Sequence, residues 1–217
     1  MIRGLRVAID ERAVVVAAEW PLRVLSSAVR RGGLGEARTI VNLHVDKHHP
    51  SGDLERPLTD FIAERGLAEP CVGLLTAAWT EHAEVAHVST SGFAVTAVAT
   101  VGLSNRTTAG RAVAARWYPS TINTIVIVDG QPEAAALVNA VVTVTEAKAL
   151  ALAEAGVLSD DGHAATGTST DAIVVAATGR GPAARFGGPA SEMGAAIGRA
   201  ALQALERGIA AWKARNP

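Results

Sequence analysis

The residues best suited to chemistry form a run of hydroxyl groups that ends in a carboxylate, at positions 166–171. The run directly precedes an apolar segment, and loops at the ends of buried strands often hold binding and catalytic residues. Hydroxyl groups can bind an amide, and a carboxylate can orient a hydroxyl or a water for attack on a carbonyl carbon. A plain turn capped by its own hydroxyls is the alternative interpretation. The members considered for a site are Thr166, Gly167, Thr168, Thr170 and Asp171.

A lysine lies on the apolar face of the long helix predicted at 132–154. At about 100° per residue, Lys148 shares this face with Val144 and Leu152. An unpaired buried charge is costly, so the amine must reach solvent, pair with a buried carboxylate or point into a cavity. Glu146 lies on nearly the opposite side and cannot pair with Lys148 within this helix. We expect the two side chains to serve different surfaces, with solvent exposure the plain interpretation for Glu146.

Two further segments bring polar side chains to the ends of predicted strands. Ser104 and Asn105 follow one strand, and Thr121 and Asn123 alternate, so an extended backbone places the latter two on one face. An asparagine can donate to a developing oxyanion and accept from an amide. This chemistry suits amide hydrolysis, but it also suits ordinary turns.

Histidines gather at positions 44–49. His44, Asp46 and His48 alternate, so on an extended backbone they would share a face, as metal ligands do. Pro50 indicates that the strand has already ended, which favours a solvated loop. We therefore predict no metal site here.

The first half of the chain is predicted to be mostly strands. The charged turn at 10–12 separates two short apolar runs and predicts a hairpin, and a second hairpin turns at 91–92. Helical spacing is confined to 54–65. The strands are expected at 5–9, 13–18, 39–45, 71–77, 85–89 and 93–102.

The second half alternates helices with strands. A short helix is expected near 107–116, then a strand at 121–128, the long helix at 132–154, a strand at 172–177 and a closing helix at about 191–212. Pro132 opens the long helix and Gly156 ends it. The segment 179–189, rich in glycine and proline, either covers a ligand or is a disordered connection.

These elements predict one α+β domain over residues 1–217, with a mixed, mostly antiparallel sheet or pair of sheets covered by outer helices. The chain is 49% hydrophobic but 4% aromatic, so its core should be built from small residues. No internal repeat and no long linker divides it. The pattern leaves open the number of layers and whether the chain forms a homo-oligomer.

Charge and composition exclude several partners. The formal net charge of -1 gives no broad positive field for a phosphate backbone or an anionic lipid surface, so neither nucleic acid nor a membrane is expected. Charged residues at 10–12 interrupt the first apolar run before the length of a signal peptide, and a cytoplasmic location is expected. Cys71 has no disulfide partner within the chain, and its apolar neighbours indicate a packing role.

Taken in order, several of these segments resemble the adenosylcobinamide amidohydrolase family. The resemblance extends over 42–204 and is strongest from residue 89 onward. The ordered set is far more specific than any one member. It consists of 102–105, 121–123, 145–148, 165–171, 187–188 and 192–194.

The resemblance implies hydrolysis of the amide that joins the aminopropanol arm to a corrin ring, giving adenosylcobyric acid for corrinoid salvage. It implies a corrinoid substrate and no nucleotide or redox cofactor. The candidate catalytic residues are then Glu146, Lys148, Thr168 and Asp171. The candidate substrate-binding residues are Asn42, Ser104, Asn105, Thr121, Asn123, Thr166, Gly167, Thr170 and Glu192.

Three alternatives stay open beside an activated water. Thr168, which follows Gly167, could itself be the nucleophile, as in enzymes that expose a threonine by self-processing. A threonine-nucleophile amidase could act on another amide. A corrinoid-binding protein without hydrolysis is the third, although Glu146, Lys148 and Asp171 weigh against it, because a pure binder needs few buried ionisable groups.

Overall fold

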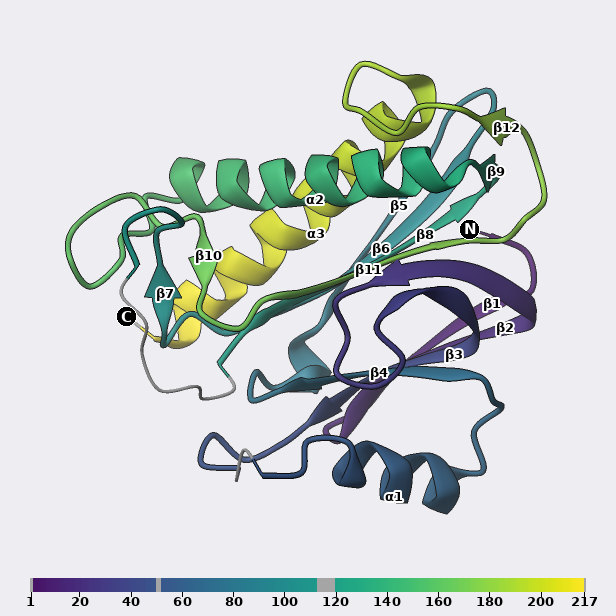
Figure 1. Ribbon diagram of the computed structural model, residues 1–217. Helices are drawn as coiled ribbons and strands as arrows, with labels where there is room; N and C mark the ends of the chain where they lie inside the picture. Colours follow the sequence, from purple (N-terminus) through teal and green to yellow (C-terminus); the bar gives the residue numbers. More distant parts are fainter. Residues whose placement is uncertain (1, 50–51, 113–119, 217) are drawn as a thin grey trace.

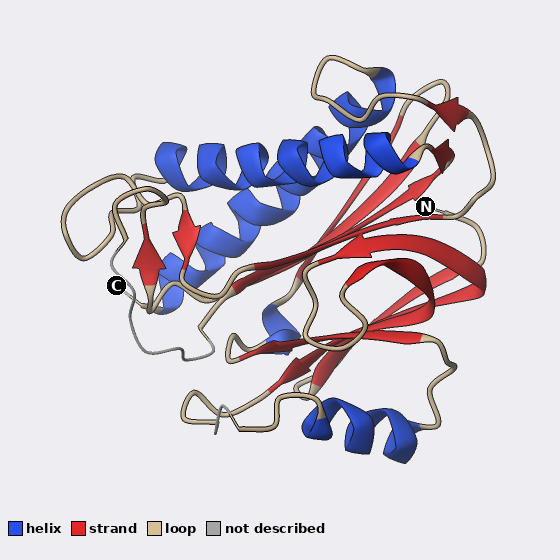
Figure 2. Ribbon diagram, viewed as in Figure 1, coloured by secondary structure: helices blue, strands red, loops and turns tan. Residues whose placement is uncertain are grey.

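The computed structural model describes residues 2–49, 52–112 and 120–216 and arranges them in four layers (Figure 1). Helix α1 (Arg56–Arg65) forms one outer layer, and α2 (Ala134–Glu154) with α3 (Glu192–Arg215) forms the other. Two sheet layers lie between them and belong to one sheet of eight described strands. Figure 2 shows the helices on both outer faces and the strands inside. The predicted α+β class with outer helices is confirmed.

The layer next to α1 contains the amino-terminal strands. Leu58, Phe61 and Ile62 of α1 pack on Val41 and Leu43 of this layer. Its strands are β1 (Leu5–Ile9), the first half of β2 (Ala13–Ser26), β3 (Gly33–His44) and β4 (Cys71–Thr76). β3 and β4 run parallel, with α1 as their connection, and the other pairs are antiparallel.

The layer next to α2 and α3 carries most of the candidate residues. In spatial order it holds the second half of β2, β11 (Ala172–Ala177), β8 (Ile122–Asp129), β6 (Ala94–Val101) and β5 (Glu84–Ser89). β8 and β11 run parallel, and α2 lies between them in the chain. Their first residues therefore meet at one edge of the sheet, which is where the polar loops begin.

Strand β2 belongs to both sheet layers. Its first half pairs with β1 and β3, and its second half pairs with β3 and β11. The pairing with β3 is interrupted between Ala17 and Leu22, where the strand passes from one layer to the other. The predicted strand 13–18 is thus confirmed but too short, because Pro21 in the middle of β2 reads as a strand end in the sequence.

Three apolar cores hold the layers together. The core between the sheets contains Val14 and Ile40 of the first layer with Ile125 and Val174 of the second. Another joins the second layer to α2 and α3 and is rich in alanine, as the composition predicted. The third lies under α1 and includes Cys71, whose thiol pKa is raised to about 12 by burial. Cys71 is therefore a packing residue.

The short helix predicted at 107–116 is wrong for its described part. Arg106–Thr107 forms strand β7, which pairs with β10 (Gly167–Thr168), and a turn follows as far as residue 112. Residues 113–116 lie outside the described residues. Pairing with a distant segment overrides the local helical pattern here.

The remaining short elements lie at the loops. They are the 3-10 helix η1 (Thr80–His82) and the parallel pair β9 (Gln131–Pro132) and β12 (Ala183–Ala184). The segment 179–189 is therefore ordered and not a disordered connection. Of the helices that the structure describes, α2 alone has the length and apolarity of a membrane span, and half of that stretch is buried in the fold. Core helices pass the same test.

Candidate active site

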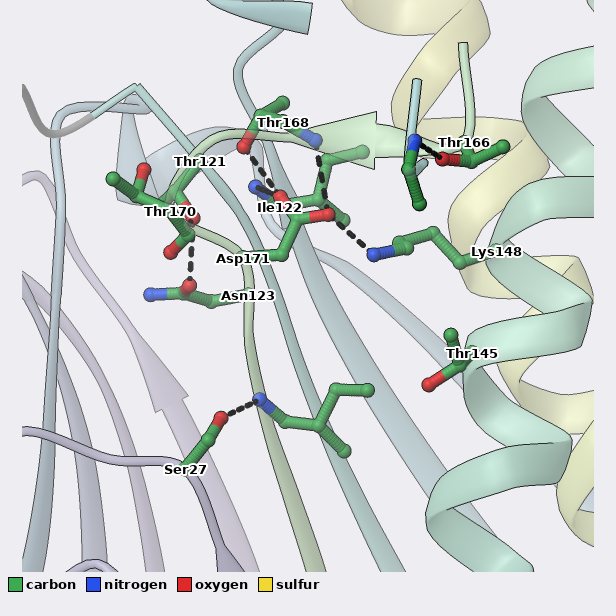
Figure 3. A network of polar contacts seen from close by, with 12 residues as sticks. Ser27, Thr121, Ile122, Asn123, Thr145, Lys148, Thr166, Thr168, Thr170 and Asp171 are labelled. Atoms are coloured by element: carbon green, nitrogen blue, oxygen red, sulfur yellow. Dashed lines mark hydrogen bonds and ion pairs between the residues drawn. The ribbon is translucent and has the colours of Figure 1, made fainter. Parts of the chain in front are cut away.

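Asp171 is the centre of a buried polar cluster at the edge where β8 and β11 begin (Figure 3). Its carboxylate pairs with the ammonium of Lys148 and accepts a hydrogen bond from the Thr168 hydroxyl. It also accepts from two backbone amides, those of Thr168 and Ile122, each at 3.0 Å. The side chains of Lys148 and Asp171 are only 9% and 11% exposed, so this ion pair is shielded from solvent.

The turn before β11 is shaped to bring this carboxylate inward. Asp171 immediately precedes β11, on the side that faces α2. Gly167 lies against the ion pair, and a Cβ atom there would overlap Asp171 Oδ2 and lie 2.8 Å from Lys148 Nζ. A glycine at this position therefore lets the backbone pass beside the charged pair.

Lys148 reaches the cluster from α2. The helical wheel placed its amine on a buried face, and of the three outcomes left open the structure shows pairing with a buried carboxylate. Glu146 is exposed and lines a groove between α2 and α3 together with Arg199. The expectation that Glu146 and Lys148 serve different surfaces is confirmed.

The loop around the cluster is held by hydrogen bonds to the segment that follows β6. The Asn105 side-chain amide donates to Ser169 Oγ at 2.7 Å, and the Ser169 amide donates to the Asn105 carbonyl at 3.2 Å. Thr166 Oγ1 accepts from the Ala109 amide at 2.8 Å. The predicted site residues Asn105 and Thr166 thus fix the loop that carries Thr168 and Asp171.

A second polar group lies beside the first, between the two sheet layers. Asn123 Nδ2 donates to Asn42 Oδ1 at 2.8 Å, and Asn42 Nδ2 donates to Thr100 Oγ1 at 2.9 Å. Thr121 Oγ1 donates to the Thr170 carbonyl at 2.7 Å and so joins this group to the loop before Asp171. Asn42, Thr121 and Asn123 are each about 1% exposed. In this conformation they support the strands from which the site projects.

A cleft of about 300 Å³ opens at the end of the two sheet layers where the Asp171 cluster lies. Its lining includes the predicted residue Ser104, together with Ser120, His44 and Trp79. The Ser120 carbonyl accepts a hydrogen bond from Thr170 Oγ1 at 3.3 Å, so the cleft borders the loop that carries Asp171. The cleft is large enough for one arm of a ligand but not for a whole corrin ring.

Glu192 lies at the other end of the sheet. Its carboxylate accepts from the Ser91 hydroxyl at 2.9 Å and the Gly92 amide at 3.0 Å, in the turn between β5 and β6. These hydrogen bonds, that of Ser91 first, lower the pKa of Glu192. The segment 179–189 joins the far end of β8 through β9 and β12, so it does not cover the Asp171 cluster.

The histidine cluster does not assemble as a metal site. Asp46 Oδ1 accepts from the backbone amide of His48 at 2.7 Å, as in a capped turn, and His44 stacks on Trp79 instead. In the ranges 2–49, 52–112 and 120–216, no group of three or more His, Cys, Asp or Glu side chains is placed to hold a metal ion.

Several contributors to the cluster carry no signal in the sequence. The amide of Ile122 serves the carboxylate through the backbone, which no residue type reveals. Ser120 and Thr100 act through contacts with distant segments. Thr100 lies opposite Asn123 on the neighbouring strand, and only this pairing could have indicated it.

The arrangement has the parts that amide hydrolysis needs. Asp171 can take a proton from a hydroxyl or a water, because a hydroxyl already donates to it. Lys148 supplies a fixed positive charge beside it, which can stabilise negative charge that develops on a carbonyl oxygen. Burial strengthens both effects, because the local dielectric is low.

Comparison with known proteins agrees with this chemistry. The sequence model of the family described as adenosylcobinamide amidohydrolase matches residues 1–217. A Methanosarcina mazei protein named adenosylcobinamide amidohydrolase is 29% identical over 191 residues, which cover 82% of this chain and 86% of that protein. A Burkholderia sp. beta-aminopeptidase structure is similar with a TM-score of 0.51, over 97% of this chain and 84% of that chain. At 15% identity, the likeness to the beta-aminopeptidase concerns the fold alone.

Proposed function

The chain belongs to the adenosylcobinamide amidohydrolase family and acts on a carbon–nitrogen bond of an amide, and we propose that this bond joins the aminopropanol arm to the corrin ring of adenosylcobinamide. Water adds across the bond to give adenosylcobyric acid and 1-amino-2-propanol. The acid can then re-enter cobamide assembly. The observation that carries the proposal is the buried cluster of Asp171, Lys148 and Thr168.

In the proposed reaction, Asp171 acts as the general base. It takes a proton from the attacking oxygen and returns it to the leaving amine, so the carboxylate is restored at the end of each cycle. Lys148 pairs with the Asp171 carboxylate and stabilises the oxyanion that forms when the carbonyl is attacked. Gly167 gives the loop room to pass beside both.

We assign the attack to a water that Asp171 and the Thr168 hydroxyl orient. The alternative is attack by Thr168 Oγ1 itself, which the hydrogen bond from this hydroxyl to Asp171 favours as a second candidate. The two differ in their intermediates. A threonine nucleophile forms an ester between the corrinoid acid and Thr168, whereas water forms no covalent adduct.

Substrate binding is proposed for the cleft and the loops around it. A corrinoid carries several amide side chains, so its site should offer neutral hydrogen-bonding groups and little net charge. Ser104 and Ser120 supply such groups at the cleft, and Asn105 and Thr170 lie in the adjoining loops. The cleft accepts the arm, and the ring lies outside it.

Incubation of the purified protein with adenosylcobinamide, followed by mass analysis of the corrinoid, tests the proposal. We expect adenosylcobyric acid and free 1-amino-2-propanol without an added cofactor, and no product with Asp171→Asn. Binding of the corrinoid without turnover would instead indicate a non-catalytic binding protein. A covalent adduct on Thr168 in a rapidly quenched sample would identify the threonine as the nucleophile.

A further inference from the structure

His44 presents one ring nitrogen in a fixed state. Its Nδ1 lies 3.0 Å from the carbonyl oxygen of Ala78, and because a carbonyl can only accept, Nδ1 carries a hydrogen and donates it. In the neutral imidazole, the lone pair is then on Nε2. Among the described residues, Nε2 of His44 has no hydrogen-bond partner.

The plane of this imidazole is also fixed. The rings of His44 and Trp79 stack with centroids 4.8 Å apart and an interplanar angle of 14°. Trp79 is 59% exposed, an unusual position for a tryptophan that only fills space. The stack and the Ala78 hydrogen bond together leave the imidazole little freedom to rotate.

His44 faces the cleft described above. It lines the same cavity as Ser104 and Ser120, at the end of the sandwich where the Asp171 cluster lies. The imidazole of His44, whose Nδ1 is held by the Ala78 carbonyl, therefore lines the proposed entrance for the substrate's arm. None of the catalytic steps proposed above uses its Nε2.

We propose that Nε2 of His44 binds the cobalt of the substrate as its lower axial ligand. A histidine that ligates a metal almost always donates its other ring N–H to a carbonyl or carboxylate, which is the state found here. Imidazole nitrogen is a common ligand of first-row transition metals. The proposal rests on the proposed function, since it requires a corrinoid substrate.

The substrate leaves this coordination position available. Adenosylcobinamide lacks the nucleotide base that fills the lower axial position of a complete cobalamin, so water occupies it. The Nε2 lone pair replaces that water, which leaves. The cobalt keeps its oxidation state and its bond to the adenosyl group, and no proton is transferred.

Coordination by His44 would also orient the scissile amide. The aminopropanol arm hangs from the same face of the corrin ring as the lower axial position. A ring held by His44 at the rim of the cleft therefore directs its arm toward the loop with Thr168 and Asp171. The coordinated imidazole acts as an anchor, and the chemistry stays with the Asp171 cluster.

Electron paramagnetic resonance of cob(II)inamide bound to the protein under anaerobic conditions tests this assignment. We expect each cobalt line to split into a triplet from one nitrogen-14 nucleus, and into a doublet when the protein carries histidine labelled with nitrogen-15. His44→Phe keeps an aromatic ring against Trp79 and should abolish the splitting. The matched variant His48→Ala, in the exposed turn that follows, should retain it.

The same samples separate this proposal from the proposed function. We expect the Kd of His44→Phe for adenosylcobinamide to rise by about 10-fold to 100-fold. Splitting that is absent from the labelled native protein, or unchanged in His44→Phe, overturns the axial ligand while turnover leaves the hydrolase standing. Failure of the native protein to bind either corrinoid overturns both.

Discussion

The carboxylate of Asp171 accepts from Lys148 Nζ, from two backbone amides and from the Thr168 hydroxyl. Loss of one donor therefore leaves a charge that is still partly satisfied, and the fold can survive it. The lysine differs from the other donors because it alone neutralises the buried charge. Its removal should affect the reaction more than the architecture.

Lys148→Met deletes the ammonium and keeps the length and apolar packing of the side chain. We expect kcat/KM to fall by about 30-fold to 1,000-fold, which corresponds to roughly 2–4 kcal/mol of lost transition-state stabilisation. Thermal stability should also fall, because the variant leaves Asp171 buried without its cation. Steady-state kinetics and a thermal melt measure the two effects.

Glu154→Gln provides the control for this variant, because Glu154 is exposed at the end of the same helix. Both its rate and its melting temperature should stay close to those of the native protein. If Lys148→Met keeps full activity, Lys148 is a structural residue and leaves the proposed site.

Gly167→Ala tests whether the loop must pass beside the ion pair. The added Cβ atom would overlap Asp171 Oδ2 and approach Lys148 Nζ to 2.8 Å, so we expect the pair to separate and turnover to be lost. Gly35→Ala is the control, because a Cβ atom at that position in β3 meets nothing within 4 Å. Equal turnover in the two variants would contradict the geometry described here.

At the scale of elements, the periodicity of the long helix predicted that Lys148 faces inward, but not what it faces. The partner lies in a loop 23 residues later, and its position depends on β11 running parallel to β8. The strand pattern likewise placed Asn123 on one face. That Asn42 meets it there follows from the stacking of the two sheet layers, which a single strand does not encode.

The first turn of α3 provides a prediction about acid stability. The Ser91 hydroxyl is the first cause of the lowered pKa of Glu192, with Thr90 and the Gly92 amide behind it. A carboxyl group whose pKa is lowered by folding stabilises the protein above its unfolded pKa, and this contribution is lost as the pH falls through the folded pKa. Glu192→Gln should therefore melt lower than the native protein near neutral pH.

The difference should disappear in acid. Thermal melts between about pH 6 and about pH 3 should show the two melting temperatures converging as the native carboxyl group is protonated. Glu206→Gln, at an exposed position of the same helix, controls for the loss of one charge. If the difference between the two melting temperatures stays constant with pH, the Ser91 and Gly92 contacts do not cause it.

At the scale of the whole molecule, we predict that the chain stays intact. The peptide bond between Gly167 and Thr168 lies within β10, which pairs with β7, and the Thr168 amide donates to Asp171. Intact-mass measurement of freshly purified and aged protein should give one species of about 22.2 kDa. Two fragments that separate before Thr168 would establish self-processing and a threonine nucleophile.

The overall class could be predicted from the sequence, because a helical pattern persists over 132–154 and a continuous apolar run, typical of a buried strand, fills 172–177. The four-layer order could not. It depends on β2 crossing between the layers through Glu19, Trp20 and Pro21, residues that look like a break in a strand. The cleft depends in turn on that order, since His44 and Ser104 come from different layers.

The shared strand β2 has a further consequence for how the protein comes apart. Its two halves donate and accept backbone hydrogen bonds in both layers, so fraying of one layer withdraws partners from the other. Neither layer is then an autonomous folding unit. We therefore expect the two layers to unfold cooperatively. A substrate that contacts the ends of both layers would then stabilise the entire chain against unfolding.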